Sequence, residues 1–110
     1  MLKLYGLKNC DTCKKALKAL AAAEVSVDFI DIRAEADLQT SVPQWLTAVG
    51  ADTLVNRRST TWRNLDDTAR NSPAQDLLIN NPTLIKRPVI ESGEDIHVGW
   101  TKTVAETLGA

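Results

Sequence analysis

Two cysteines separated by two residues, Cys10 and Cys13, are the residues whose type and spacing point most directly to chemistry. A thiolate is a nucleophile, and a C-x-x-C spacing, a helix N-terminus or nearby cations can lower a cysteine pKa from about 8.5 to roughly 3.5–7.5. We expect Cys10 at the mouth of a helix, where backbone N–H groups and the helix dipole stabilise an anion. Cys10 is therefore the candidate nucleophile. Cys13, on the same helical face, is placed to attack a mixed disulfide formed at Cys10 and so to act as the resolving thiol.

Other roles of a C-x-x-C pair have less support in this sequence. A zinc site needs four nitrogen or sulfur ligands, whereas the chain has one histidine, His97, and no further cysteine. Two cysteines in 110 residues do not make a disulfide framework. We therefore expect redox or nucleophilic chemistry and no metal. A plainer alternative for Cys13 stays open, because cysteine is often a small buried hydrophobic residue.

Composition limits the classes of protein to consider. The chain has 110 residues, of which 44% are hydrophobic and 25% are charged, and its net charge is −1. We expect a single soluble domain with one core, and the near-neutral charge argues against direct binding of nucleic acid. No apolar run approaches the roughly 18 residues that span a bilayer, and the N-terminus does not resemble a signal peptide. We expect a cytoplasmic protein with no membrane partner and with reduced cysteines.

The elements that must position the cysteines are a strand and a helix. Residues 2–5 alternate as in a strand that ends at Gly6, and the apolar residues after Cys13 recur at helical spacing. Residues 25–32 read as a second strand. Two strands that bracket a helix predict a β-α-β unit with parallel strands.

Residues from about 35 to 80 have a helical pattern. Ser41 is expected to cap one helix, which carries Trp45 into the core and stops at Gly50. A second helix is expected to begin with Ser72 as its cap. The sequence therefore predicts a helical insert within an α/β frame.

The last third of the chain returns to strands. Apolar residues at 84–85 and 88–90 predict strand structure, and a hairpin turn at 92–95 leads into a strand at 96–98. His97 is expected on the solvent-facing side of that strand, and Thr101 is expected to cap a terminal helix. The order β-α-β, helical insert, β-β-α predicts a thioredoxin-like mixed sheet.

Four stretches along nearly the whole chain resemble landmarks of the ArsC/Spx family, which contains glutaredoxin-linked arsenate reductases, the Spx regulators and the YffB-like proteins. The stretches are residues 4–12 (LYGLKNCDT), 58–65 (RSTTWRNL), 81–88 (NPTLIKRP) and 98–100 (VGW). The chain is most similar to the YffB-like branch. The resemblance implies one thioredoxin-like domain over residues 1–110 with the helical insert at about 35–80.

The resemblance also implies a set of site residues. Cys10 corresponds to the cysteine that attacks the substrate. Arg87 corresponds to an arginine that holds an oxyanion, and Pro88 corresponds to a cis-proline that faces the nucleophile. Arg58 corresponds to a second anion-binding arginine, and Thr12 is a further candidate in the first landmark. Guanidinium groups suit this role because they bind anions through two parallel hydrogen bonds.

Some alternatives remain open for these residues. Arg57 lies one position from Arg58 and is a possible counterpart of the family arginine, and a solvated helix face would equally explain Arg57, Arg58 and Arg63. The arsenate reductases have a third arginine near the last strand, where this sequence has none at residues 97–100. That difference argues against arsenate as the physiological substrate.

Two functions follow from the resemblance. The first is a glutathione-dependent thiol or arsenate-type reductase with Cys10 as nucleophile, no bound cofactor, glutathione as co-substrate, and glutathione or glutaredoxin as partner. The second is a redox-sensing regulator that, like Spx, binds the C-terminal domain of the RNA polymerase α subunit and uses a Cys10–Cys13 disulfide as its switch. We favour the enzyme, and we expect a monomer.

Overall fold

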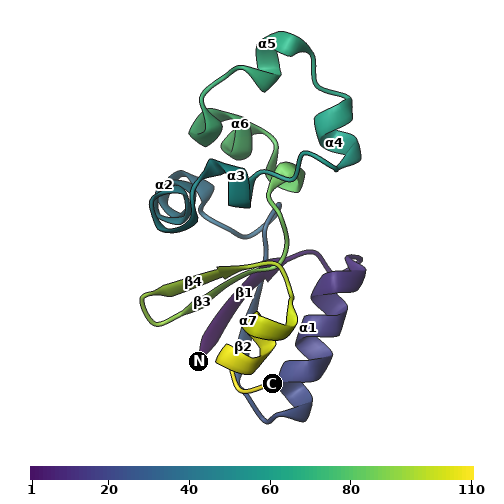
Figure 1. The fold of residues 1–110 in the computed structure, drawn as a ribbon, viewed down its shortest axis with the longest axis vertical. Helices are drawn as coiled ribbons and strands as arrows, with labels where there is room; N and C mark the ends of the chain where they lie inside the picture. The colour runs from purple at the N-terminus through teal and green to yellow at the C-terminus, as the bar shows by residue number, and fades with distance from the viewer. The chain divides into compact units, whose positions relative to one another are not determined.

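A computed structural model describes all residues, 1–110 (Figure 1). They form two units. The first, which we call the sheet unit, contains Met1–Ala36 and Arg87–Ala110, and the second, the helical unit, contains Asp37–Lys86. No helix in either unit has the length and apolar character that crossing a membrane requires.

The sheet unit is built on four strands in the order β2-β1-β3-β4. Their bounds are Leu2–Gly6 for β1, Val27–Asp31 for β2, Val89–Ser92 for β3 and Asp95–Val98 for β4. β1 and β2 are parallel, whereas β3 is antiparallel to both β1 and β4. The helix α1 (Asp11–Ala22) connects β1 to β2. The expected mixed sheet of a thioredoxin-like fold is confirmed.

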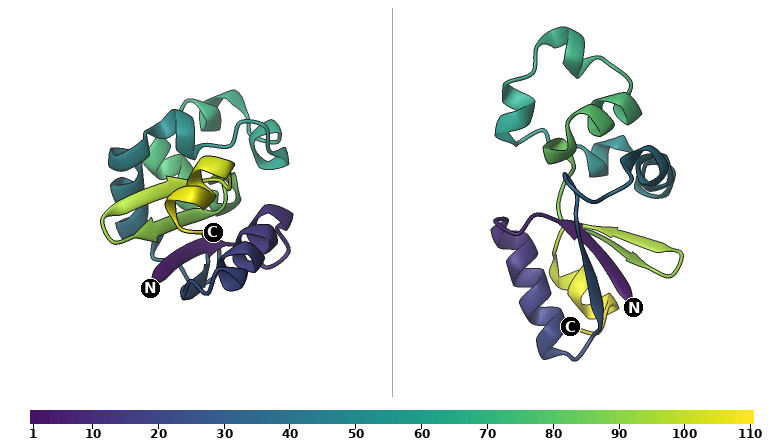
Figure 2. Two further views of the ribbon diagram at one scale, coloured as in Figure 1. Left: turned by 60° about the horizontal axis from the view of Figure 1, so that its bottom comes forward. Right: turned by 180° about the vertical axis from the view of Figure 1, so that it is seen from behind.

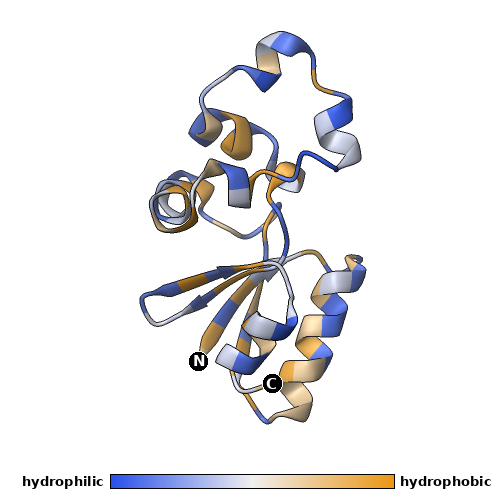
Figure 3. Cartoon of the chain, viewed as in Figure 1, coloured by the Kyte–Doolittle hydropathy of each residue, from blue (hydrophilic) through white to orange (hydrophobic).

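The core of the sheet unit lies between the sheet and two helices. Leu4 on β1 pairs with Ile90 on β3, and both side chains are fully buried together with Ala16 and Leu20 of α1. The terminal helix α7 (Lys102–Thr107) lies beside α1 on the same face of the sheet (Figures 1 and 2). The strands alternate between hydrophobic and hydrophilic residues (Figure 3), which is the pattern of a sheet with one face against helices.

In the C-terminal part of the sheet unit, the structure confirms the expected role of Thr101 but differs from the expectation for His97. The Thr101 hydroxyl accepts a hydrogen bond from the Val104 backbone N–H at 3.2 Å, so the expected cap of the last helix is confirmed. His97 lies on the edge strand β4 and pairs with Ile90. Since paired residues point to the same face, His97 lies on the helix-covered side. It is half-buried there, so the expected edge position is confirmed and the expected solvent-facing side is wrong.

The helical unit consists of short helices around a small core. They are α2 (Leu38–Val49), α3 (Ala51–Leu54), α4 (Thr60–Arg63), α5 (Asp67–Arg70), α6 (Ala74–Asn80) and the 3₁₀ helix η1 (Pro82–Leu84). α2 packs against α6, and Trp45, Leu77 and Leu78 are buried, so the expected core position of Trp45 is confirmed.

The expected start of α2 at Ser41 is wrong by one turn. The helix begins at Leu38, with Asp37 as the N-cap residue, and Ser41 lies inside it. Leu38, Val42 and Trp45 follow helical spacing and are all buried, so burial of Leu38 favours the longer helix. The free energy gained by burying Leu38 outweighs the loss of the backbone hydrogen bond that Pro43 cannot donate inside the helix.

Two further local expectations in the helical unit are wrong. The Ser72 hydroxyl donates to the Ala69 carbonyl at 2.6 Å and does not cap α6, which begins at Ala74. The expected strand at 84–85 is absent, because residues 82–84 form η1 and Ile85 makes only an isolated bridge with Val55.

Gly6 ends β1 at the point where the first turn of α1 packs against the sheet. A Cβ atom added at Gly6 would lie 2.5 Å from the Cys13 sulfur and 3.3 Å from its Cβ. A side chain larger than hydrogen fits there only if the Cys13 side chain shifts from its place. Gly6 therefore allows Cys13 to approach the strand.

We predict that Gly6→Ala destabilises the protein by about 1–3 kcal/mol, because the added methyl group overpacks a filled site. Cys13→Ala removes the sulfur that the methyl group meets. In a double-mutant cycle followed by urea unfolding, the same Gly6→Ala change should then be markedly less destabilising. An equal effect in both backgrounds would show that the Cys13 sulfur is not what limits the space at Gly6.

Candidate active site

Cys10 lies at the N-terminus of α1, as expected from the sequence. It is the N-cap residue with an extended backbone (φ −92°, ψ 119°), and its carbonyl accepts the first helical hydrogen bond from Lys14 N–H at 2.9 Å. The Cys10 N–H donates to the Leu7 carbonyl at 3.2 Å, which closes the turn between β1 and α1. Cys10 is half-buried, whereas Cys13 is buried.

The surroundings of Cys10 favour its thiolate. Burial by itself would raise the pKa of Cys10, but hydrogen bonds from the Cys13 backbone N–H and the Cys13 thiol, and then the charge and hydrogen bonding of Arg87, outweigh it. The net effect lowers the pKa of Cys10 below its usual value. Each of these groups stabilises the charged form, which is the form that attacks electrophiles.

Cys13 has the opposite character. Its side chain is fully buried in the first turn of α1. The pKa of Cys13 is raised to about 11, mainly by burial and also by the neighbouring Cys10, against the lowering effects of a hydrogen bond with the Leu7 backbone and of the Arg87 charge. Cys13 therefore stays a protonated thiol near neutral pH and donates its hydrogen bond to Cys10.

Arg87 and Pro88 enter the sheet unit immediately before β3. The Arg87–Pro88 peptide bond is cis. Pro88 is fully buried, and its carbonyl accepts a hydrogen bond from Gly99 N–H at 2.8 Å, which ties the start of β3 to the end of β4. Arg87 is half-buried and hydrogen-bonds to Cys10, and its positive charge lowers the pKa of both Cys10 and Cys13.

The structure brings together some of the site residues suggested by the sequence. Cys10, Cys13, Arg87 and Pro88 all belong to the sheet unit, and the first three interact directly. Thr12 is exposed in the first turn of α1 and makes no hydrogen bond to either cysteine, so its role in binding stays a prediction.

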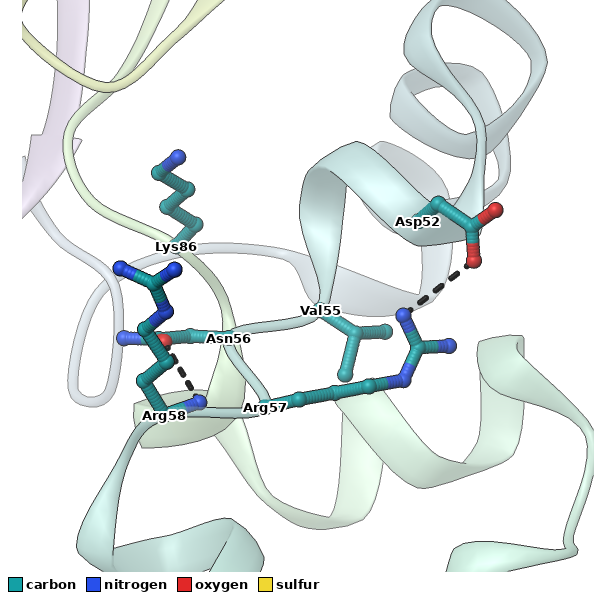
Figure 4. A pocket seen from close by; sticks show the side chains of 6 residues that line it. All are labelled: Asp52, Val55, Asn56, Arg57, Arg58 and Lys86. Carbon is teal, nitrogen blue, oxygen red and sulfur yellow. Dashed lines mark hydrogen bonds and ion pairs between the residues drawn. The ribbon is translucent and has the colours of Figure 1, made fainter.

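Arg58 belongs to the helical unit, where it lines a pocket with Asn56 and Lys86 (Figure 4). Sequence reasoning missed Asn56 and Lys86. It also missed Gly6, whose place at a strand end was visible but whose closeness to Cys13 was not. Nowhere in the chain do three or more His, Cys, Asp or Glu side chains come together as metal ligands would.

The arrangement supports nucleophilic sulfur chemistry. A stabilised thiolate at Cys10 can attack a disulfide sulfur, or the central atom of an oxyanion, with displacement of a leaving group. The Arg87 guanidinium lies beside the attacking sulfur and can also stabilise negative charge on a substrate.

Comparison with known proteins places these features in a family. The model of the ArsC family matches residues 5–107. An uncharacterised protein of Haemophilus influenzae is 49% identical over 106 residues, which cover 93% of both chains. The global transcriptional regulator Spx of Bacillus subtilis is 31% identical over 107 residues, which cover 93% of this chain and 82% of Spx.

Solved structures give the same grouping. A YFFB protein superposes with a TM-score of 0.91 and 34% identity, and the match covers all of both chains. An arsenate reductase-related protein of Brucella melitensis has a TM-score of 0.76 and 32% identity, with 96% of this chain and 92% of that chain covered. A glutaredoxin of Archaeoglobus fulgidus, with a TM-score of 0.52 and 17% identity over 97% of this chain and 83% of its own, shares the fold alone.

We predict that alkylation of the reduced protein modifies Cys10 with a titration midpoint below that of an ordinary thiol and leaves Cys13 unmodified at neutral pH. Arg87→Ala should move the Cys10 midpoint to higher pH, because the thiolate loses a positive charge and a hydrogen bond. Arg87→Lys should reverse part of this shift, since it keeps the charge. Alkylation rate against pH, with mass spectrometry of each cysteine, measures the effect.

The matched control for this titration is Arg33→Ala. Arg33 is an exposed arginine of the same unit that is not among the groups affecting Cys10. Its removal should leave the Cys10 midpoint in place. An Arg87→Ala titration that overlays that of the parent protein would refute the contact between the guanidinium and the thiolate.

Proposed function

The chain belongs to the ArsC family, and from this membership we propose that it is a glutathione-dependent thiol reductase in which Cys10 is the nucleophile. The observation that carries the proposal is the difference between the two cysteines. Cys10 has a lowered pKa beside Arg87, whereas Cys13 is buried with a raised pKa. One reactive and one unreactive thiol suit an enzyme whose second thiol comes from solution.

The proposed reaction has two exchange steps. The Cys10 thiolate attacks the glutathione sulfur of a mixed disulfide, so that a Cys10–glutathione disulfide forms and the substrate leaves as a thiolate. A second glutathione thiolate then attacks the glutathione sulfur of this intermediate, which releases oxidised glutathione and restores the Cys10 thiolate. Overall, the mixed disulfide and one glutathione thiolate become the substrate thiolate and oxidised glutathione, so one free glutathione is consumed and no other reductant is needed. Arg87 stabilises Cys10 as attacking and as leaving group.

Glutathione suits the second step better than Cys13 does. At neutral pH a thiol with a pKa of about 11 is almost entirely protonated, and the Cys13 side chain is also fully buried. Attack by Cys13 would need both deprotonation and movement of the first turn of α1. We therefore propose that Cys13 acts mainly as a hydrogen-bond donor to the Cys10 thiolate, and the resolving role expected from its spacing becomes the alternative.

A second candidate function rests on a different observation. Spx, a global transcriptional regulator, is 31% identical to this chain over nearly its whole length. In a regulator of this kind, a Cys10–Cys13 disulfide would act as a redox switch for binding to the C-terminal domain of the RNA polymerase α subunit. The two functions have different requirements. A reductase needs catalytic turnover of a substrate, whereas a regulator needs a binding partner and no turnover.

We predict that Cys10→Ser reduces turnover of a small mixed disulfide with glutathione to the uncatalysed rate. Cys13→Ser should keep measurable turnover, because the serine hydroxyl can still donate a hydrogen bond to the Cys10 thiolate, and Cys13→Ala should be slower because it cannot. A coupled assay that follows the formation of oxidised glutathione measures all three. Normal turnover in the Cys10→Ser protein would end the assignment of the nucleophile.

The regulator is tested by binding of the reduced and oxidised proteins to the isolated polymerase α domain. We expect no binding that depends on the oxidation state, together with glutathione-dependent turnover. Absence of turnover combined with oxidation-dependent binding would replace the reductase by the regulator.

A further inference from the structure

A cluster of lysines lies around the start of α1, next to the nucleophile. Residues 8–22 contain one carboxylate, Asp11, and four lysines, whereas the whole chain has a net charge of −1. All four lysines are exposed, and none of their ammonium groups has an ion-pair or hydrogen-bond partner. The exchange steps proposed above use none of them. These residues, which we call the lysine face, are Lys8, Lys14, Lys15 and Lys18.

Helix geometry brings two members of the lysine face close to Cys10. Cys10 is the N-cap residue of α1, and Lys14, one turn later, donates its backbone N–H to the Cys10 carbonyl at 2.9 Å. Lys18 follows one turn further along the same row. Long side chains on a helix lean toward its N-terminus, so the ammonium groups of Lys14 and Lys18 are expected on the Cys10 side of their own backbone positions.

Lys8 lies in the turn before Cys10, at the end of the parallel strands. β1 and β2 end next to each other in the sheet. The pKa of Asp31 at the end of β2 is lowered, mainly by hydrogen bonds from the Ala34 and Arg33 N–H groups. The charges of Arg33 and Lys8 lower it further, which places Lys8 near this strand end. Cationic side chains therefore come both from the turn before Cys10 and from the helix after it.

The positions of these lysines do not stabilise α1. Positive charge is favourable toward the C-terminus of a helix and unfavourable toward its N-terminus. The last turn of α1 nevertheless has no basic residue, and its hydrophilic residues concentrate nearer its start (Figure 3). Lys18 follows Lys14 by four residues and Lys15 by three, and like charges at these spacings repel each other. Sequences break such local rules mainly at functional sites, so the lysine face is suited to a partner rather than to helix stability.

We propose that the lysine face binds an acidic segment of a protein substrate, so that the preferred mixed disulfide joins glutathione to a protein cysteine flanked by Asp or Glu. This inference rests on the reductase function proposed above, and the reaction is the same. The Cys10 thiolate attacks the glutathione sulfur, and the protein thiolate leaves. Nearby carboxylates raise the pKa of the substrate cysteine and make its thiolate a poorer leaving group. The lysines offset this effect, because they stabilise the negative charge of the segment and of the leaving thiolate.

The spacing along α1 predicts where the acidic residues lie in the substrate. At a rise of about 1.5 Å per residue, Lys14 and Lys18 are about 6 and about 12 Å along the helix from Cys10. An extended peptide rises about 3.3 Å per residue, so acidic residues about two to four positions from the substrate cysteine reach these lysines. The same acidic residues placed much farther from the cysteine do not.

The test compares three glutathionylated peptides, each with a single cysteine, in the coupled glutathione assay at low salt. The near peptide has its glutamates within four residues of the cysteine, the distant peptide has the same glutamates at least eight residues away, and the basic peptide has lysines in place of the near glutamates. We expect kcat/KM for the near peptide to exceed that for the distant peptide about tenfold, since each exposed ion pair contributes about two- to fivefold. The basic peptide should be the slowest. Salt should reduce the ratio of near to distant, in which any effect of the lysines on glutathione itself cancels.

Lysine variants assign the ratio to the lysine face. The double variant Lys14→Gln, Lys18→Gln should bring the ratio of near to distant close to one. Its Cys10 alkylation midpoint should stay in place, because neither lysine is among the groups that shift the pKa of Cys10. The matched control is Lys3→Gln. Lys3 is an exposed lysine of β1 that lies opposite Glu91 and Asp28 on the neighbouring strands, and its removal should leave the ratio as in the parent.

Binding to the Cys10→Ser protein, which cannot turn over, separates this inference from the reductase itself. Fluorescence anisotropy of the labelled peptides should show tighter binding of the near peptide than of the distant one, and Lys14→Gln, Lys18→Gln in the same background should remove the difference. Equal binding of the two, equal kcat/KM values for them, or faster turnover of the basic peptide would overturn the acidic substrate and leave the reductase standing. Preferential binding of the near peptide without turnover of any peptide would overturn the reductase and keep the docking surface.

Discussion

The contact between the Cys13 sulfur and Gly6 is the constraint on which the thiol site depends. It brings the first turn of α1 against the end of β1, because only hydrogen fits between them. Cys10 then falls at the N-cap position, where the Cys13 N–H and thiol both point to its sulfur. Arg87 reaches the same place from another part of the chain, since β3 pairs with β1 from Val89 opposite Tyr5 onwards.

Local signals in the sequence were enough for the sheet unit but not for the helical unit. The alternation in β1, the helical spacing after Cys13 and the Thr101 cap each depend on a few neighbouring residues, and the structure has all three. Ser41 and Ser72 also look like caps locally. There, burial of Leu38 and the bond from Ser72 to the Ala69 carbonyl decided the helix bounds. Burial of Leu38 is a tertiary effect that spacing alone does not reveal, whereas the Ser72 bond is a local one that competes with capping.

Some residues of the candidate site could likewise be predicted from the sequence, and others could not. The spacing of Cys10 and Cys13 predicts thiol chemistry. Arg87 and Pro88 lie far from the cysteines in the sequence and were predicted only from the family resemblance. No pattern pointed to Asn56 and Lys86, because they become neighbours only through the pairing of the segments around Val55 and Ile85. A single bridge between distant residues leaves no periodic trace in either segment.

The two candidate functions, the thiol reductase and the regulator switched by a Cys10–Cys13 disulfide, depend on the same electrostatic interactions at Cys10. The Cys13 hydrogen bonds and the Arg87 charge lower the pKa of Cys10 and so favour its thiolate, and the same two groups lose their charged partner whenever Cys10 is oxidised. A mixed disulfide with glutathione and a disulfide with Cys13 both remove one negative charge beside Arg87. The two outcomes separate at the Cys10–glutathione disulfide. A glutathione thiolate that attacks the glutathione sulfur frees Cys10, whereas a Cys13 thiolate that attacks the Cys10 sulfur closes the Cys10–Cys13 disulfide. Burial of Cys13 keeps its thiolate scarce, which supports the proposed attack by glutathione over attack by Cys13 as long as α1 keeps its first turn closed. The packing at Gly6 that builds the nucleophile therefore also favours turnover over a lasting disulfide.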